Sequence, residues 1–196
     1  MSCEVWVARH GETEWSRTGR HTGRTDIPLT EAGRREAEGL RRAFGGRRFA
    51  LVLSSPLSRA LDTCRIAGYG DEAITSDDLL EWDYGAVEGR TSAEVAAGNP
   101  GWTIWTGALP RGETIEQVAA RADRVIARAA TAGGDVLLFA HGHIIRILTA
   151  RWLGLGPRDG RLFALSTASL GVLGEESGGR VIRSWNLVPA RALPTG

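Results

Sequence analysis

The sequence has 196 residues, of which 42% are hydrophobic and 24% are charged, and its formal net charge at pH 7 is +1. These values are ordinary for a globular domain that is large enough to bury a full hydrophobic core. A net charge so close to zero gives no general attraction to nucleic acid or to an anionic membrane. Because no apolar run is long enough to span a bilayer, we expect a single domain over residues 1–196 with no membrane or nucleic acid partner.

Arginine supplies all 24 basic residues, since the chain contains no lysine. This composition excludes lysine Schiff-base chemistry and the type of P-loop that depends on a lysine. Cys3 and Cys64 lie far apart and outside any motif, which indicates two unpaired thiols in a reducing compartment. The N-terminus lacks the basic start and the cleavage site of a signal peptide, so the expected location is cytoplasmic.

The first half of the chain predicts two pairs of a strand and a helix. In chain order, the predicted elements are a strand over 5–8, a helix over 30–44, a strand over 50–53 and a helix over 55–67. Thr30 has a side chain suited to cap the first of these helices. In the second helix, Ser55 is the expected cap and Pro56 the expected first residue.

The second half predicts further helices and strands. In chain order, they are a helix over 114–132, a strand over 136–140, a helix over 144–153 and strands over 169–173 and 181–185. The helix that starts at Thr114 has apolar residues every three or four positions, which is typical of one buried face. The strand over 136–140 is wholly apolar, as expected at the centre of a buried sheet. The alternation of strands and helices predicts a layered α/β domain.

Residues 85–112 interrupt this alternation. The segment is rich in glycine and proline and contains Trp102 and Trp105. We expect a lid-like excursion that packs over one end of the sheet, and a surface loop held by the two tryptophans is an equal alternative.

Polar side chains follow three of the predicted strands. Arg9 and His10 follow the first strand, Arg59 lies one turn into the helix after the second, and His141 follows the strand over 136–140. If these strands are parallel neighbours, their carboxyl ends meet at one edge, where helix N-termini also point N–H groups at ligands. Guanidinium groups bind phosphate and carboxylate in a bidentate manner. The sequence therefore predicts an anion site at this edge.

A histidine that is surrounded by arginines can act as a nucleophile. Nearby positive charge disfavours the imidazolium form, so we expect His10 to be neutral near pH 7 and able to attack phosphorus. The reaction also needs a general acid for the leaving oxygen. Glu81 follows two leucines and is surrounded in sequence by aromatic residues, which favour the protonated form that this role requires.

Residues 9–15, Arg-His-Gly-Glu-Thr-Glu-Trp, resemble the N-terminal signature of the histidine phosphatase superfamily, which includes the cofactor-dependent phosphoglycerate mutases. The resemblance covers nearly the whole chain. Further segments that match the family, in the same order, are 22–30 with Gly33, 54–63, 81–85, 112–114 and 140–143. Because several signatures occur in the right order, the resemblance is far more specific than the first one alone.

The resemblance implies a role for each matching residue. His10 would accept the phosphoryl group, and Glu81 would protonate the leaving alcohol and then activate the water that releases phosphate. The phosphoryl oxygens would be held by Arg9, Arg59, His141 and the backbone N–H of Gly142. The positions that match residues near the phosphate or the rest of the substrate are Ser16, Thr22 and Gly23. Glu113 would lie behind the site.

The resemblance also has implications for the fold and for cofactors. The expected fold is three-layered, with a mixed and mostly parallel sheet between helices, as in phosphoglycerate mutases. No cofactor and no metal ion are implied.

Hydrolysis is favoured over the mutase reaction by the segment after the acidic motif. Residues 91–110 contain no basic residue, so the paired arginines of the mutases have no counterpart there. His143 also stands where mutases usually have asparagine. The chain resembles most the small acid phosphatases and the sedoheptulose bisphosphatase-like members, so the expected substrate is a phosphomonoester such as a sugar phosphate.

Two other classes of protein are weighed against this interpretation. His141 and His143 are spaced like a metal-binding pair of a metal-dependent hydrolase, although the spacing supplies no carboxylates to complete the site. A module that binds a phosphorylated ligand without catalysis is the second alternative. His21 has no assigned role, and His143 is expected to orient its neighbours or cap a helix. The expected partner is a small phosphomonoester, and a homodimer is compatible with the sequence.

Overall fold

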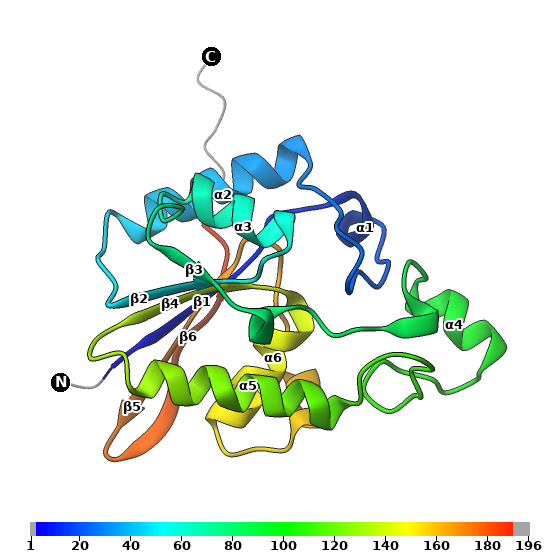
Figure 1. Ribbon diagram of the computed structural model, residues 1–196. Coiled ribbons are helices and arrows are strands. Elements are labelled where there is room, and N and C mark those ends of the chain that lie inside the picture. Colours follow the sequence, from blue (N-terminus) through cyan, green and yellow to red (C-terminus); the bar gives the residue numbers. More distant parts are fainter. Residues whose placement is uncertain (1–2, 190–196) are drawn as a thin grey trace.

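The computed structural model describes residues 3–189 and has a six-stranded sheet at its centre, in the order β3-β2-β4-β1-β5-β6 (Figure 1). The four parallel strands are β1 (Val5–Arg9), β2 (Leu51–Ser54), β3 (Ala73–Thr75) and β4 (Val136–Ala140). The two antiparallel strands at one edge are β5 (Leu170–Glu176) and β6 (Gly179–Leu187). The prediction of a mixed, mostly parallel sheet is therefore confirmed.

Helices cover both faces of the sheet and make the fold three-layered (Figure 1). One face is covered by α2 (Glu31–Phe44) and α3 (Ser58–Ile66), and the other by α5 (Ile115–Ala130) and α6 (Gly142–Trp152). Successive strand residues point to opposite faces, so Val7 joins the core beneath α5 and α6 while Ala8 joins the core beneath α2 and α3.

Two helix starts follow the capping chemistry that the sequence indicates. The Thr30 hydroxyl accepts the N–H of Gly33 at 3.0 Å at the start of α2. At the start of α5, the Thr114 hydroxyl accepts the N–H of Gln117 at 3.2 Å, and the Gln117 side chain accepts the N–H of Thr114 at 2.7 Å. This reciprocal pair is a capping box, which satisfies two backbone donors at once.

The predicted starts of two other helices were wrong, and both corrections concern the site. Helix α3 starts at Ser58 with Leu57 as its cap, and the Ser55 hydroxyl lies 2.7 Å from Nε2 of His141 and accepts the N–H of Leu57 at 3.4 Å. Helix α6 starts at Gly142, with His141 as its cap, two residues before the predicted start. The short elements that the sequence did not predict are α1 (Glu14–Arg17), β3, η1 (Asp77–Leu79), η2 (Gly85–Val87), α4 (Ser92–Gly98) and η3 (Pro157–Leu162).

The segment 85–112 contains η2 and α4 and lies at the end of the molecule where α4 projects (Figure 1). Its Trp102 is buried in the same core cluster as Val7, and Trp105 packs against that cluster. Apolar packing therefore joins this segment to the body of the domain. Within residues 3–189, no helix is long and apolar enough to cross a membrane.

Candidate active site

The sheet register brings three strand ends together. Strand β4 lies between β1 and β2. The backbone N–H groups of His10 and Ser55 donate to the β4 carbonyls of Ala140 and Phe139, at 3.0 and 2.9 Å. His141 is the next residue after β4, so it lies between the other two strand ends. The predicted convergence at one sheet edge therefore occurs.

A cavity of about 190 Å³ opens at this edge. The residues that line it are Arg9, His10, Ser16, Gly19, Arg20, His21, Thr22, Glu81, Tyr84, Gly142, His143, Arg146 and Leu165. Of the residues that the sequence singled out, Arg59, His141, Gly23 and Glu113 do not line the cavity. Arg59 and His141 are both fully buried, and the ring of His141 lies 5.2 Å from that of His10. These two side chains therefore form a layer behind His10.

His10 has one ring nitrogen held by the backbone and one that is free. Its Nδ1 lies 2.7 Å from the carbonyl oxygen of Gly11, and since a carbonyl can only accept, Nδ1 carries the proton. Burial, followed by the charges of Arg59 and Arg9, holds the pKa of His10 well below its usual value. The neutral ring thus presents an unprotonated Nε2, the form that can act as a nucleophile.

The loop after His10 is held close to α2 by two glycines. A Cβ on Gly11 would collide with the carbonyl oxygen of Gly33, and a Cβ on Gly33 would collide with the carbonyl oxygen of Glu12. No other residue type fits at either position without moving the backbone. This contact fixes the carbonyl of Gly11, which in turn orients the ring of His10.

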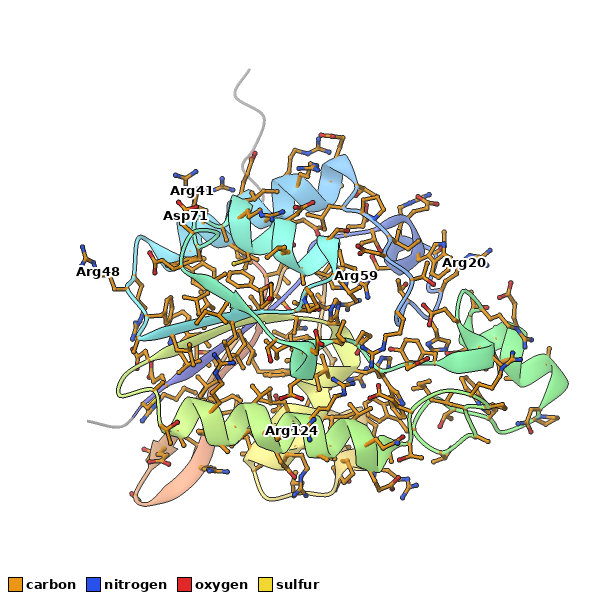
Figure 2. The ribbon with its side chains drawn as sticks, viewed as in Figure 1. Arg20, Arg41, Arg48, Arg59, Asp71 and Arg124 are labelled. Atoms are coloured by element: carbon orange, nitrogen blue, oxygen red, sulfur yellow. The ribbon has the colours of Figure 1, made fainter. Side chains whose placement is uncertain are left out.

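Arg59 reaches from α3 into the interior, beneath the N-terminal end of that helix (Figure 2). Its Nε donates to Nδ1 of His141 at 3.1 Å, and Nε2 of His141 donates to the Ser55 hydroxyl at 2.7 Å. Its other acceptors are the carbonyl oxygens of Thr22, Gly23 and Thr25, at 3.2, 2.8 and 2.9 Å. Arg59 therefore fixes the 22–25 loop and the His141 ring while placing a positive charge behind His10.

These contacts bear on the metal alternative. Both ring nitrogens of His141 are engaged by protein groups, so neither is free to bind a metal ion. Within residues 3–189, no three or more His, Cys, Asp and Glu side chains are grouped in a way that could hold a metal ion.

Arg9 contributes a guanidinium group to the cavity wall. Its Nη1 donates to the carbonyl of Leu165 at 2.6 Å. Its Nε is buried and forms no hydrogen bond. In the described part of the chain, it is the one buried polar side-chain atom without a hydrogen-bond partner. The remaining nitrogen, Nη2, has no hydrogen-bond partner among residues 3–189 and is accessible to solvent, so it can donate to an anion in the cavity.

Glu81 lies at the N-terminus of α6. Its carboxylate accepts the backbone N–H groups of His143 and Ile144, both at 3.0 Å, and that of Trp82 at 2.9 Å. The side chain is buried, and these three donors hold both carboxylate oxygens in place. The sequence did not indicate this contact because it placed the start of α6 two residues too late.

Arg121 is a site-organising residue that the sequence interpretation missed. It is 8% exposed on α5, and its Nη1 donates to the carbonyls of Asp78 and Leu80 at 2.9 and 2.8 Å. It also binds both carboxylate oxygens of Glu113 at 2.9 Å. The available signal was a charged residue on the otherwise apolar face of α5, three positions after Val118.

Glu113 completes this clamp on the Glu81 segment. Its Oε2 accepts the N–H of Asp83 at 3.0 Å. Burial raises the pKa of Glu113, but hydrogen bonds from Arg121 and Asp83 outweigh it and hold the pKa below its usual value. The segment on both sides of Glu81 is therefore fixed by an ion pair on α5 and the loop before it.

His21 and His143, which had no role in catalysis from the sequence, both line the cavity. Nδ1 of His143 lies 2.6 Å from the Tyr84 hydroxyl, and Nε2 of His21 lies 3.2 Å from the Ser92 hydroxyl. The ring of Trp105 lies 5.1 Å from that of His143. The rings of His21, Tyr84 and His143 form an aromatic wall of the cavity, and Trp105 of the 85–112 segment packs against it.

The fold and the cavity define a class of protein. An α/β domain whose strand ends bring a neutral histidine, guanidinium groups and a buried carboxylate to one small cavity is suited to move phosphoryl groups by way of the histidine.

Comparison with known proteins places the chain within that class. The model of the histidine phosphatase superfamily (branch 1) matches residues 5–188, so the chain belongs to this superfamily. An acid phosphatase of Mycobacterium tuberculosis is 42% identical over 178 residues, which cover 89% of this chain and 87% of the relative. Sedoheptulose 1,7-bisphosphatase of Saccharomyces cerevisiae is 34% identical over 184 residues, covering 76% of this chain and 67% of the relative.

A solved structure agrees with the fold. An open reading frame product of Mycobacterium tuberculosis superimposes with a TM-score of 0.90 at 38% identity, covering 96% of this chain and 99% of that one. The family and these phosphatase relatives make the chain a phosphatase that acts on phosphomonoesters.

Proposed function

We propose that the enzyme hydrolyses small phosphomonoesters through a covalent phosphohistidine on His10. The observation that carries this proposal is the orientation of the His10 ring. Its Nδ1–H is bonded to Gly11, so the lone pair is on Nε2, and the residue lines a cavity together with Arg9 and Glu81.

In the first step, Nε2 of His10 attacks phosphorus and the ester P–O bond breaks. The proton on Glu81 moves to the leaving oxygen, so the alcohol departs neutral. The phosphoryl oxygens are held by Nη2 of Arg9 and the N–H of Gly142 at the start of α6, with the charge of Arg59 behind them. These donors are already fixed in place, which is the condition for strong electrostatic stabilisation of the transition state.

In the second step, water attacks the phosphohistidine and the P–N bond breaks. The Glu81 carboxylate takes the proton of the attacking water, inorganic phosphate forms and the lone pair returns to Nε2. The three backbone donors to Glu81 support this step, because they fix the position of the carboxylate that acts as the base.

The size of the cavity supports a small substrate. Its volume of about 190 Å³ is below the roughly 300–1,000 Å³ typical of sites for drug-sized ligands. A sugar phosphate or a similar phosphorylated metabolite fits this chemistry, and one relative bears the name of a sugar bisphosphatase. A cytoplasmic location is part of the proposal, because Cys3 and Cys64 are both free thiols.

Rapid-quench experiments with a ³²P-labelled phosphomonoester test the proposal. The wild-type protein should carry a transient covalent label, and His10→Ala should carry none and lose turnover by on the order of 10⁴-fold or more. The matched control is His21→Ala, which removes another cavity imidazole and should still form the label. Full turnover by His10→Ala would rule out the nucleophile. Isomerisation of 3-phosphoglycerate that depends on 2,3-bisphosphoglycerate would show a mutase instead.

A further inference from the structure

We propose that Glu88 is a positioning residue for the reaction, which holds the 22–25 loop in the conformation that fixes Arg59. Glu88 belongs to the 85–112 segment and lines no part of the cavity, so it acts through other groups. This inference rests on the proposed hydrolysis at His10. It links the 85–112 segment to the side chains that lie behind the nucleophile.

Three successive backbone N–H groups of the loop donate to the Glu88 carboxylate. Oε1 accepts the N–H groups of Gly23 and Thr25 at 2.9 and 2.8 Å, and Oε2 accepts that of Arg24 at 3.4 Å. A run of such N–H groups forms a concave anion site, called a nest, and hydrogen bonds to a carboxylate are stronger than those between neutral groups. Glu88 therefore supplies the anion that stabilises this loop conformation.

The Glu88 carboxylate is bound by the backbone and not by a cation. Within residues 3–189, no arginine or histidine nitrogen lies within 4.0 Å of it. The side chain of Arg24 pairs instead with Glu113, with Nη2 3.3 Å from Oε2. An ion pair would hold only a side chain, whereas bonds to N–H groups hold the main chain. Glu88 thus fixes the path of the loop itself.

Gly23 allows the loop to approach this segment closely. A Cβ at position 23 would lie 2.5 Å from the carbonyl oxygen of Trp82 and 2.6 Å from Oε2 of Glu88. A side chain there would push the loop away from both groups. The glycine is therefore needed for the contact between the loop and Glu88, apart from any contact with a substrate.

A short stretch of backbone pairing brings Glu88 to the loop. The N–H of His21 donates to the carbonyl of Arg90 at 2.9 Å, and the N–H of Gly89 donates to the carbonyl of His21 at 2.8 Å. The chain after α1 thus lies beside the start of the 85–112 segment (Figure 1). The pairing includes His21 but not the next residues, whose N–H groups have the Glu88 carboxylate as their partner.

The carbonyl groups of the same loop are the acceptors of Arg59. Three of them accept its N–H groups at 2.8–3.2 Å, and its Nε donates to Nδ1 of His141. Arg59 is fully buried, so a loop that moved away would leave a buried charge without acceptors. The guanidinium group would then shift, and with it the His141 ring and the positive charge behind His10. Glu88 therefore affects the reaction through the loop and Arg59.

Two substitutions at position 88 test this role. Glu88→Ala empties the nest, and we expect it to lower kcat by about 10- to 100-fold with little change in KM, because small displacements around a reacting centre are costly. Glu88→Gln keeps an amide oxygen that can accept from Gly23 and Thr25, so its kcat should be intermediate. Steady-state assays with 4-nitrophenyl phosphate measure both constants.

Glu94→Ala is the matched control. It removes another carboxylate of the 85–112 segment that accepts a backbone N–H, that of Thr91 at 2.8 Å, but that does not contact the 22–25 loop. Its kcat should equal that of the wild type.

Acetate replaces the group that Glu88→Ala removes. Sodium acetate should raise the kcat of Glu88→Ala several-fold, because the anion can occupy the emptied nest. Acetamide, which has the same shape without the charge, should raise it less. Wild-type protein and Glu94→Ala in the same solutions at constant ionic strength correct for inhibition by acetate.

The ¹⁵N NMR signal of Nδ1 of His141 reports on Arg59 directly, since this atom accepts the N–H of Arg59 at 3.1 Å. The signal should shift in Glu88→Ala and return toward its wild-type position when acetate is added. It should not shift in Glu94→Ala.

The outcomes separate this inference from the proposed function. A wild-type kcat in Glu88→Ala, or a loss equal to that in Glu94→Ala, would overturn the role of Glu88 while hydrolysis at His10 stands. If Glu88→Ala does not fold, a wild-type kcat and His141 signal in Glu88→Gln would overturn it. A wild-type protein without a label on His10 would overturn the proposed function, and the His141 signal would still show whether Glu88 controls Arg59.

Discussion

The cavity has two sides that are held by different forces. The floor, formed by His10 and Glu81 with Arg59 and His141 in a layer behind them, is fixed by hydrogen bonds to backbone groups and between side chains. The aromatic wall, formed by His21, Tyr84 and His143 with Trp102 and Trp105 packed against it, is held mainly by ring packing, with ring centroids 5.1–6.4 Å apart. Directional bonds set positions to within tenths of an ångström, whereas ring packing tolerates exchange. The floor is thus suited to chemistry and the wall to substrate choice.

The largest expected effect after loss of His10 is on the floor. Glu81→Gln keeps the shape of the side chain but cannot transfer a proton, so kcat should fall by about 10²–10⁴-fold. Steady-state assays should show a smaller loss for an aryl phosphate, whose leaving oxygen needs less protonation, than for a sugar phosphate. Asp123→Asn, far along α5, is the matched control. Equal losses for both substrates would contradict the role of Glu81 as general acid.

Arg59→Met tests whether the floor is also a structural unit. The change would leave the carbonyls of Thr22, Gly23 and Thr25 and Nδ1 of His141 without their donor. Buried groups left unpaired are costly, so we expect the free energy of unfolding to fall by about 3 kcal/mol or more. Urea unfolding measures this, with the exposed Arg41→Met as control, expected within about 0.5 kcal/mol of wild type. If Arg59→Met had the same midpoint of urea unfolding as the wild type, the hydrogen bonds of Arg59 would not be needed for stability.

The wall should respond differently from the floor. Trp105→Ala removes the ring beneath Arg146 and beside His143. We expect KM to rise by about tenfold, a loss of about 1.4 kcal/mol in substrate binding, with a smaller change in kcat. Trp6→Ala, which removes an indole packed against Phe44 and Phe49 on the other side of the sheet, is the control for general destabilisation. If Trp105→Ala lowered kcat and left KM unchanged, the aromatic wall would not differ from the floor in its role.

The smallest expected effect concerns pH, because the ring of His10 should not titrate near neutral pH. Burial and two arginines hold the pKa of His10 well below 6.5, so its NMR ring signals should not titrate between about pH 7 and 6. A midpoint near 6.5 would contradict the neutral nucleophile. The unfolded chain does take up protons in this range, and since the pKa values of His141 and His143 are also lowered by burial, stability should decrease as the pH falls below about 6.5.

More features of the floor than of the aromatic wall could be predicted from the sequence. His10 and His141 directly follow strands and Arg9 is the last residue of one, and the rule that parallel strand ends share an edge is enough to bring them together. The inward bonds of Arg59 were not predictable, because they depend on how the 22–25 loop folds back over α3. The predicted starts of α3 and α6 were each wrong by two residues. For this reason the sequence did not indicate the contact between Ser55 and His141 or that between Glu81 and the α6 backbone.

The wall required contacts that no local pattern encodes. The pairing of Tyr84 with His143 joins residues that are 59 positions apart, and that of His21 with Ser92 spans 71. Tertiary packing decides such pairs, so the roles of His21 and His143 stayed open until the rings were placed side by side.

The close backbone contact between Gly11 and Gly33 extends the sensitivity of the enzyme beyond its cavity. Gly33 lines no part of the cavity, yet any side chain there would push the start of α2 away from the loop that aligns the nucleophile. Random mutagenesis scored for lost turnover should therefore recover substitutions at position 33 as often as at positions in direct reach of a substrate.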